Sequence, residues 1–266
     1  MKLSLCLEML FTELPFADRI AVAARLGYDA VEFWDFRNKD LSEIAKAVQD
    51  QGLTVAAMSG NRRNALIESD ASAALIEEME EVFEAANRVN CHKIMMLSDV
   101  LSEDGSALPL EGEPQEKLNA LVENLQMLAR HPQAASFTLL LEPLNTALDH
   151  RGCFLDRSAI GTQVVKDVNS ANVKLLYDIY HMSMMNEDVL AEIEKSLDWI
   201  GYVHVADKPG RHQPGTGKID YEKVNALLEK LHYDGFVGME FSALGDDEAA
   251  AAAPLNIFNL NRCRQI

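Results

Sequence analysis

The stretch Phe137-Thr-Leu-Leu-Leu-Glu-Pro-Leu-Asn145 is an apolar, β-forming run that ends abruptly in a carboxylate and a proline. A short continuous apolar run is typical of a fully buried strand, and proline cannot extend the hydrogen-bond ladder of a central strand. We therefore predict a buried strand with Glu142 at its carboxyl end. In parallel α/β sheets, side chains at this end of the strands form the functional site.

Three later stretches repeat this design, each with an apolar run that ends in one side chain able to bind a metal. They are Val173-Lys-Leu-Leu-Tyr-Asp178, Ile200-Gly-Tyr-Val-His204 and Gly235-Phe-Val-Gly-Met-Glu240. Parallel strands place their carboxyl ends at one edge of a sheet. We therefore expect Glu142, Asp178, His204 and Glu240 to converge.

Strand-like and helix-like segments alternate along the whole chain. The predicted strands are 3–7, 30–33, 53–58, 92–97, 138–141, 173–177, 202–205 and 236–239, and the predicted helices are 15–26, 41–51, 71–88, 116–130, 158–168, 189–197, 221–231 and 246–260. Such alternation implies parallel strands joined by right-handed crossovers. Eight units in 266 residues fit an α/β fold, a single (β/α)₈ TIM barrel, which typically has about 250 residues. We assign residues 1–266 to one such domain.

The composition excludes several classes of protein. The net charge of −18 disfavours binding to nucleic acid, whose phosphates an acidic surface repels. We expect no membrane span, because no segment approaches 18 uninterrupted apolar residues, and the N-terminus lacks the pattern of a signal peptide. The four cysteines, Cys6, Cys91, Cys153 and Cys263, show no Cys-x-x-Cys pair and suggest reduced thiols. We expect a cytoplasmic enzyme with a small-molecule substrate; a homo-oligomer remains open.

The four converging side chains indicate a metal site. Three carboxylates at one place would repel one another and raise each other's pKa, and a divalent cation removes that difficulty. Carboxylate oxygens and an imidazole nitrogen, without a thiolate, suit Mn²⁺, Mg²⁺, Co²⁺ or Zn²⁺. Any one of these residues alone is more often a helix cap or a salt-bridge partner. Four on consecutive strands favour the metal site.

Glu142 and Glu240 are also candidates for proton transfer. They come from strands that are not neighbours, so we expect them on different sides of the metal. One carboxylate can remove the proton α to a carbonyl, and a carboxylate can return a proton elsewhere. This is the chemistry of an aldose–ketose isomerase or of an epimerase.

The second half of the chain resembles the hydroxypyruvate isomerase family within the xylose isomerase-like TIM barrels. The matching runs are Leu-Leu-Glu142-Pro-Leu-Asn145, Tyr-Asp178-Ile-Tyr-His181-Met, His204-Val-Ala-Asp207-Lys-Pro-Gly-Arg211-His-Gln-Pro-Gly-Thr-Gly217 and Tyr-Asp-Gly-Phe-Val-Gly-Met-Glu240-Phe. The resemblance implies that Glu142, Asp178, His204 and Glu240 bind the metal and that Glu142 and Glu240 are catalytic. It also implies that His181 and Arg211 contact substrate oxygens.

The first half departs from that family. Its members usually carry a His-Asn-Leu/Phe-Pro-Ala-Gly type segment after the third strand, whereas this chain has Met58-Ser-Gly-Asn-Arg-Arg-Asn64. Arg211, together with Arg62 or Arg63, could bind the acid group of an anionic substrate. Exposure to solvent is the default for both Arg62 and Arg63. Trp34 and Phe36, which follow the second strand, are candidates for the pocket wall or for plain packing.

Other functions fit parts of the same pattern. A metal-dependent dehydratase could use the same acids but would expel a hydroxyl group. A non-catalytic sugar- or metal-binding barrel is disfavoured by carboxylates on both sides of the metal. An abasic-site endonuclease needs a basic DNA-binding face, which the net charge of −18 opposes.

Overall fold

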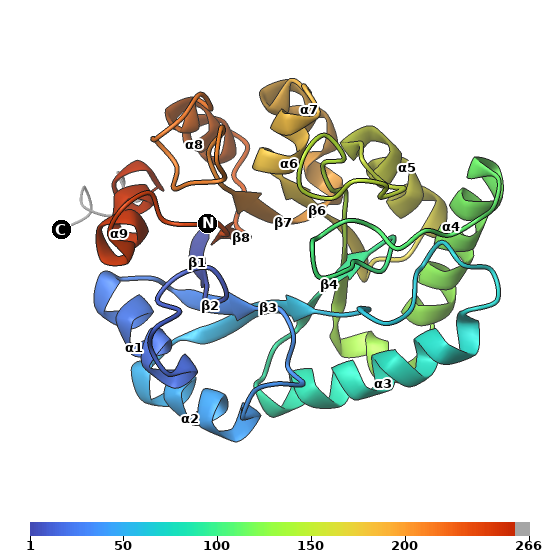
Figure 1. Ribbon diagram of the computed structural model, residues 1–266, viewed down its shortest axis with the longest axis horizontal. Helices are drawn as coiled ribbons and strands as arrows, with labels where there is room; N and C mark the ends of the chain where they lie inside the picture. The colour runs from blue at the N-terminus through green and yellow to red at the C-terminus, as the bar shows by residue number, and fades with distance from the viewer. Residues whose placement is uncertain (259–266) are drawn as a thin grey trace.

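The computed structural model describes residues 1–258, and these residues form a closed barrel of eight parallel strands in sequence order. The strands are β1 (Lys2–Cys6), β2 (Ala30–Phe33), β3 (Thr54–Ser59), β4 (Lys93–Leu97), β5 (Thr138–Glu142), β6 (Val173–Asp178), β7 (Ile200–Val205) and β8 (Phe236–Met239). The barrel closes where β1 pairs with β8. Figure 1 shows the helices as a ring around these strands. The predicted TIM barrel is confirmed.

The helices agree with the prediction to within a few residues at most ends. They are α1 (Phe16–Leu26), α2 (Leu41–Gln51), α3 (Ser72–Arg88), α4 (Pro114–Ala129), α5 (Ser158–Val168), α6 (Ile179–Met184), α7 (Val189–Ser196), α8 (Tyr221–Lys230) and α9 (Asp247–Phe258), with 3₁₀ turns η1 (Pro132–Ser136) and η2 (Leu197–Trp199). The short α6 was not predicted, and it carries His181. The end of the predicted last helix, 259–260, and Cys263 lie outside the described residues.

Local signals explain where the helices begin and end. The Asp40 carboxylate accepts hydrogen bonds from the backbone N–H groups of Ser42 and Glu43 and so caps the start of α2. Gly27 and Gly52 end α1 and α2 with φ of +97° and +67°, a left-handed conformation that glycine adopts at little cost. These ends return the chain to the next strand.

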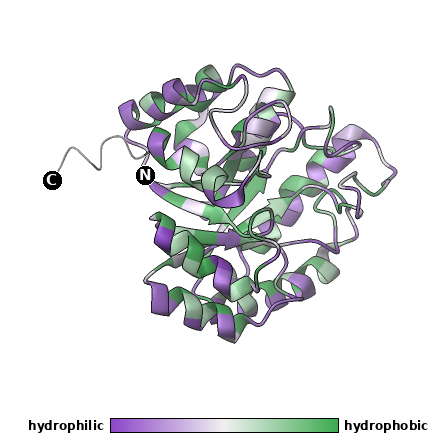
Figure 2. Ribbon diagram, turned by 60° about the vertical axis from the view of Figure 1, so that its left-hand side comes forward, coloured by the Kyte–Doolittle hydropathy of each residue, from purple (hydrophilic) through white to green (hydrophobic). Residues whose placement is uncertain are grey.

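The strands bury both of their faces. Leu139 and Leu141 belong to the large apolar cluster shared with the helices, whereas Leu140 belongs to a smaller cluster built almost entirely from strand residues. Because side chains alternate along a strand, the first set faces the helices and the second fills the barrel. In Figure 2 the helices carry both the hydrophobic and the hydrophilic colour, as expected of helices with one face on the core and the other toward solvent.

Two further expectations concern the cell compartment. Cys6, Cys91 and Cys153 are buried free thiols in the described part of the chain. None of its helices combines the length and hydrophobicity needed to cross a membrane. The cytoplasmic location itself stays a prediction.

Candidate metal centre and substrate pocket

Glu142, Asp178, His204 and Glu240 lie together at the carboxyl end of the barrel, with one potential ligand atom from each within 4.8 Å of all the others. The Nδ1 atom of His204 lies 3.6 Å from Glu142 Oε1, 4.0 Å from Asp178 Oδ2 and 3.7 Å from Glu240 Oε2. Two ligands of one ion, with bonds of about 2.1 Å, lie at most about 4.2 Å apart, and the three distances from His204 Nδ1 meet this limit. The structure thus brings all four predicted ligands together around one centre.

Strand register explains this convergence. Asp178 is the last residue of β6 and pairs directly with His204 of β7, while His204 pairs with Gly238 of β8. Glu142 ends β5, and Glu240 follows β8 with its N–H donating to the Val205 carbonyl. Four neighbouring strands therefore end at one level, each with its polar side chain over the barrel.

Without a metal ion, the buried acidic and basic groups of this cluster have pKa values that differ from their ordinary values. Burial raises the pKa of Glu142 above its ordinary value, although His204 offsets part of the rise. Burial and then the Glu142 carboxylate raise the pKa of Asp178 to about 7. Burial acts to lower the pKa of His204, but the carboxylates of Glu240 and Glu32 raise it well above its ordinary value. When no cation is present, the neighbouring carboxylates therefore favour a proton on His204, which supplies a positive charge at the centre.

Glu142 Oε1 and His204 Nδ1, which lie 3.6 Å apart, are among the buried polar atoms of this region that have no hydrogen-bond partner within residues 1–258. Such unpaired atoms are costly in a protein interior, and both belong to the predicted ligand set. A divalent cation would satisfy both. The residues present thus fit a metal ion.

Glu32, a buried carboxylate behind His204, was not among the predicted site residues. Glu32 Oε1 lies 2.8 Å from His204 Nε2, and the Tyr202 hydroxyl donates to Glu32 Oε2. A Cβ atom at Gly238 would lie 2.5 Å from Glu32 Oε2 and 2.7 Å from His204 Cδ2, so only glycine leaves room for this pair. Glu32 could have been identified from the sequence, because it is a carboxylate in the otherwise apolar run Ala30-Val-Glu-Phe33.

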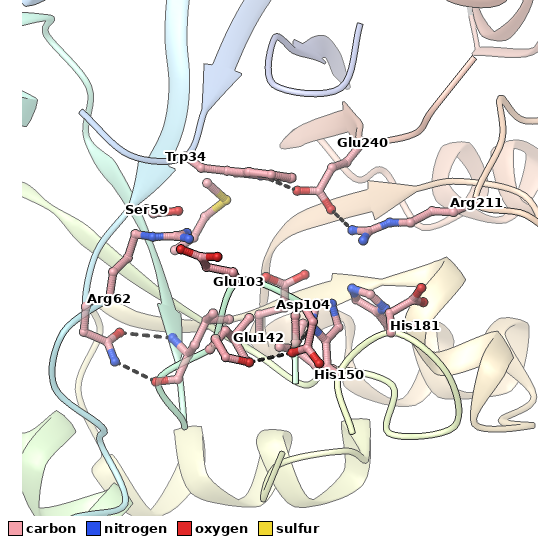
Figure 3. Close-up of a pocket in the computed structure, with 18 of the residues that line it drawn as sticks. Trp34, Ser59, Arg62, Glu103, Asp104, Glu142, His150, His181, Arg211 and Glu240 are labelled. Carbon is pink, nitrogen blue, oxygen red and sulfur yellow. Dashed lines mark hydrogen bonds and ion pairs between the residues drawn. The ribbon is translucent and has the colours of Figure 1, made fainter. Parts of the chain in front are cut away.

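Glu240 is held by two donors from distant parts of the chain. The Trp34 indole donates to Glu240 Oε1 at 2.8 Å, and Arg211 Nη2 donates to Glu240 Oε2 (Figure 3). Burial acts to raise the pKa of Glu240, but His204, Arg211 and the indole bring it below its ordinary value. Trp34 thus lies in the pocket wall and orients a predicted catalytic group, and Arg211 is engaged with a protein carboxylate.

The loop that carries Arg211 is organised around Asp207. This buried carboxylate accepts hydrogen bonds from the N–H groups of Lys208, Gly215, Gly217 and Ile219 at 2.8–3.1 Å. A Cβ atom at Gly217 would approach the Lys208 carbonyl oxygen to 2.3 Å. The motif from His204 to Gly217 therefore builds a rigid loop, and that loop positions Arg211.

His181 of α6 lies beside Asp178, with its Nε2 atom 3.6 Å from Asp178 Oδ2. Asn145 Oδ1 accepts from the N–H groups of Leu148 and Asp149, which directs the Asn145 amide nitrogen toward His181 Nδ1 at 2.7 Å. Burial and then Arg211 hold the pKa of His181 well below its ordinary value. His181 is thus a neutral imidazole that accepts at Nδ1 and donates from Nε2.

A cavity of about 660 Å³ opens above the cluster. Glu142, Glu240, His181 and Arg211 line it, as does Arg62, whereas Arg63 and Phe36 do not. Phe36 instead packs beside the apolar core. Of the two alternatives for these aromatic residues, the pocket wall holds for Trp34 and plain packing holds for Phe36.

The family model described as xylose isomerase-like TIM barrel matches residues 20–259. The chain belongs to this family. A protein of Streptomyces coelicolor named putative hydroxypyruvate isomerase is 33% identical, with 92% of this chain and 91% of that protein covered. A 2-oxo-tetronate isomerase of Cupriavidus necator is 28% identical, with coverage of 88% and 90%. As a member of this group of relatives, the chain is an isomerase.

Among solved structures, that of an AP endonuclease, family 2, from Brucella melitensis is similar, with a TM-score of 0.86 and 25% identity. The similarity covers 96% of this chain and 98% of that one. The resemblance to hydroxypyruvate isomerases and to the wider barrel family, predicted from the strand-end motifs, is therefore confirmed.

Proposed function

We propose that this protein is a metal-dependent isomerase that interconverts a small 2-oxo acid with a hydroxyl group at C3 and the corresponding 2-hydroxy-3-oxo acid, which is an aldehyde when the substrate has three carbons and a ketone when it has four. One observation carries the proposal. Two glutamates, Glu142 and Glu240, reach the same four-residue centre from strands that are not neighbours, and both line the cavity. The names of the relatives, hydroxypyruvate isomerase and 2-oxo-tetronate isomerase, indicate the substrate class.

With hydroxypyruvate as the example, the reaction moves hydrogen without any oxidant. One glutamate removes a proton from C3, so that the C3–H bond breaks and an enediolate forms. The other glutamate delivers a proton to C2, where a new C–H bond forms. The proton of the C3 hydroxyl is lost as C3 becomes the aldehyde, and the C2 oxygen gains one. The product, tartronate semialdehyde, has the same atoms as the substrate.

We propose Glu142, Asp178, His204 and Glu240 as the residues that hold the cation, with Mn²⁺ or Mg²⁺ as the first candidates for their oxygen-rich set. When bound, the cation would stabilise negative charge that develops on the two substrate oxygens. The Arg211 and Trp34 donors hold the Glu240 carboxylate in one orientation. His181 lines the cavity, and its Nε2–H is proposed as a neutral hydrogen-bond donor to a substrate oxygen.

Epimerisation is the second candidate, because two carboxylates on separate strands can also exchange a proton at a single carbon from opposite faces. A dehydratase would use the same groups to lose water. The mass of the product separates dehydration from the other two reactions. Solvent deuterium separates isomerisation from epimerisation, since the label enters C2 of the product in the first and the original carbon in the second.

The direct test is turnover of hydroxypyruvate and of 2-oxo-tetronate by protein reconstituted with Mn²⁺ or Mg²⁺, followed by NMR in D₂O. We expect isomeric product with one solvent deuterium. Product lighter by one water would identify a dehydratase, and the absence of exchange or product with any short sugar or sugar acid would contradict the proposal.

A further inference from the structure

The cavity above the metal centre has two chemically different sides. The proposed ligands all come from β5, β6, β7 and β8. The opposite side is built from the ends of β2, β3 and β4 and the loops after them, with Trp34, Ser59, Arg62 and Leu97 in the cavity wall. Figure 3 shows Ser59 and Arg62 across the drawn pocket from Arg211 and His181. A substrate whose reacting carbons lie at the metal centre can therefore present its remaining substituent to this opposite side.

Three arginines were candidates for binding an acid group, and the structure separates them. Arg211 donates to Glu240, and its guanidinium lies 5.5 Å from the centre of the Tyr180 ring. Arg63 turns to α3, where its Nη2 donates to Glu81 at 2.8 Å. Arg62 lines the cavity, and within residues 1–258 its side chain forms no hydrogen bond or ion pair.

The backbone that carries Arg62 is held firmly by Glu78 of α3. This fully buried carboxylate accepts from the N–H groups of Arg62, Arg63 and Asn64 at 2.8–3.1 Å. Asn61 fixes the same loop to the end of β4, because its side chain bonds both the N–H and the carbonyl of Leu97. A guanidinium on such a support is placed in advance of substrate binding, which reduces the entropy lost on binding.

Acidic groups face the same part of the cavity. Asp104 and Glu103 of the loop between β4 and α4 line it. Asp104 accepts hydrogen bonds from the hydroxyl groups of Ser102 and Ser106, and Glu103 is exposed. Neither forms an ion pair with Arg62 in the described part of the chain. The Arg62 guanidinium is therefore available to a ligand.

We propose that Arg62 binds the carboxylate of the substrate and thereby selects 2-oxo acids over neutral ketoses. The proposal rests on the isomerase function proposed above and adds the residue that recognises the acid group of the substrate. A planar guanidinium suits a carboxylate because it can form two parallel hydrogen bonds. Arg62 is also the only arginine or lysine that lines the cavity from the β2–β4 side in residues 1–258.

The test compares two substrates that differ only at this group. Hydroxypyruvate and dihydroxyacetone share the reacting hydroxyketone, but the second has a hydroxymethyl group in place of the carboxylate. We expect Arg62→Met to raise KM for hydroxypyruvate on the order of 10- to 100-fold, the loss typical of a charge-assisted hydrogen bond. Turnover of dihydroxyacetone should change little. Arg62→Lys should restore part of the affinity for the acid, because it keeps the charge.

Arg63→Met is the matched control, since it removes an arginine one residue away that does not line the cavity. It should leave KM for both substrates near the native value. Equal effects of Arg62→Met and Arg63→Met, or an equal loss with both substrates, would overturn the proposal. So would native enzyme that prefers dihydroxyacetone to hydroxypyruvate.

A binding measurement tests the carboxylate subsite independently of the proposed reaction. Calorimetric titration of the Mn²⁺-loaded proteins with hydroxypyruvate measures affinity whether or not turnover occurs. Weaker binding by Arg62→Met alone supports the carboxylate subsite even if the isomerase function fails. Equal affinity of native protein, Arg62→Met and Arg63→Met refutes the subsite even if the enzyme is an isomerase.

Discussion

The Glu32 carboxylate lies 2.8 Å from the Nε2 atom of His204, on the side of the imidazole ring away from the proposed metal ligands. Both side chains are fully buried inside the barrel. A hydrogen on Nε2 that is directed to Glu32 leaves the lone pair of Nδ1 for a cation. Glu32 is thus a positioning residue, which acts on the metal through His204.

We expect Glu32→Gln to weaken metal binding by about 10- to 100-fold, the usual effect of changing a partner of a metal-bound histidine. The amide keeps the size of the side chain but removes its charge. Titration of Mn²⁺ by electron paramagnetic resonance measures the free ion directly. Tyr202→Phe is the control, because it removes the hydroxyl group that donates to Glu32 and keeps the aromatic ring beside His204. Native Mn²⁺ affinity in Glu32→Gln would show that the pair has no role at the metal.

Glu240→Gln should lose turnover more than it loses metal. The change keeps one possible ligand oxygen and leaves three other ligands, but removes a basic carboxylate. We expect turnover to fall about 10²- to 10⁴-fold, as is typical for the loss of one general acid–base group. Metal content by mass spectrometry and turnover should be measured together.

Glu142→Gln should behave in the same way if the two glutamates share the proton transfers. Deuterium exchange without product in one variant would identify the glutamate that removes the first proton. Near-native turnover in both variants, with metal bound, would assign the proton transfer to other groups or to a hydride shift.

Chelation should abolish activity, and Mn²⁺ or Mg²⁺ should restore it. Since the cation binds only the folded protein, it should also raise the midpoint of thermal unfolding. At a free metal concentration 100 times the Kd, the added free energy of unfolding is about 2.7 kcal/mol. Calorimetry of chelated and reloaded protein measures the shift. Full activity after exhaustive chelation would remove the basis of the proposed mechanism.

Metal affinity should rise with pH through the neutral range. In the metal-free protein the pKa of Asp178 is raised to about 7, chiefly by burial, and that of His204 is raised well above its ordinary value by Glu240 and Glu32 against the effect of burial. Protons therefore occupy these groups below their raised pKa values, and a cation must displace them. Titrations of Mn²⁺ at pH 6 and pH 8, each in two buffers with different ionisation enthalpies, measure the affinity and the protons released. Identical affinity at both values of pH would contradict the expectation.

Much of the fold and of the candidate site could be predicted from short stretches of sequence. Apolar runs identify buried strands because the residues that fill a barrel are contiguous in sequence. A polar residue at the end of such a run, as Glu142 is, lies at the mouth whatever the details of packing. The helix ends at Gly27 and Gly52 were also predictable, because they depend on the backbone preferences of single residues.

Pairings between distant elements could not be predicted in this way. Trp34 and Glu240 are 206 residues apart, and Tyr202 and Glu32 are 170 residues apart. They meet only because the barrel closes between β1 and β8 and brings β2 near the last strands. No local pattern distinguishes a charge that finds a buried partner from a charge that faces solvent.

The sequence by itself thus determined the barrel and the four side chains at its mouth, since both follow from the order and the ends of the strands. Only the tertiary structure decided which of the arginines lines the cavity. Arg62 and Arg63 are neighbours in sequence and identical in chemistry, yet one lines the cavity and the other pairs with Glu81 on α3. The direction of each side chain is set by the turn that Glu78 holds, and Glu78 lies on a helix that the local sequence of the loop does not contain.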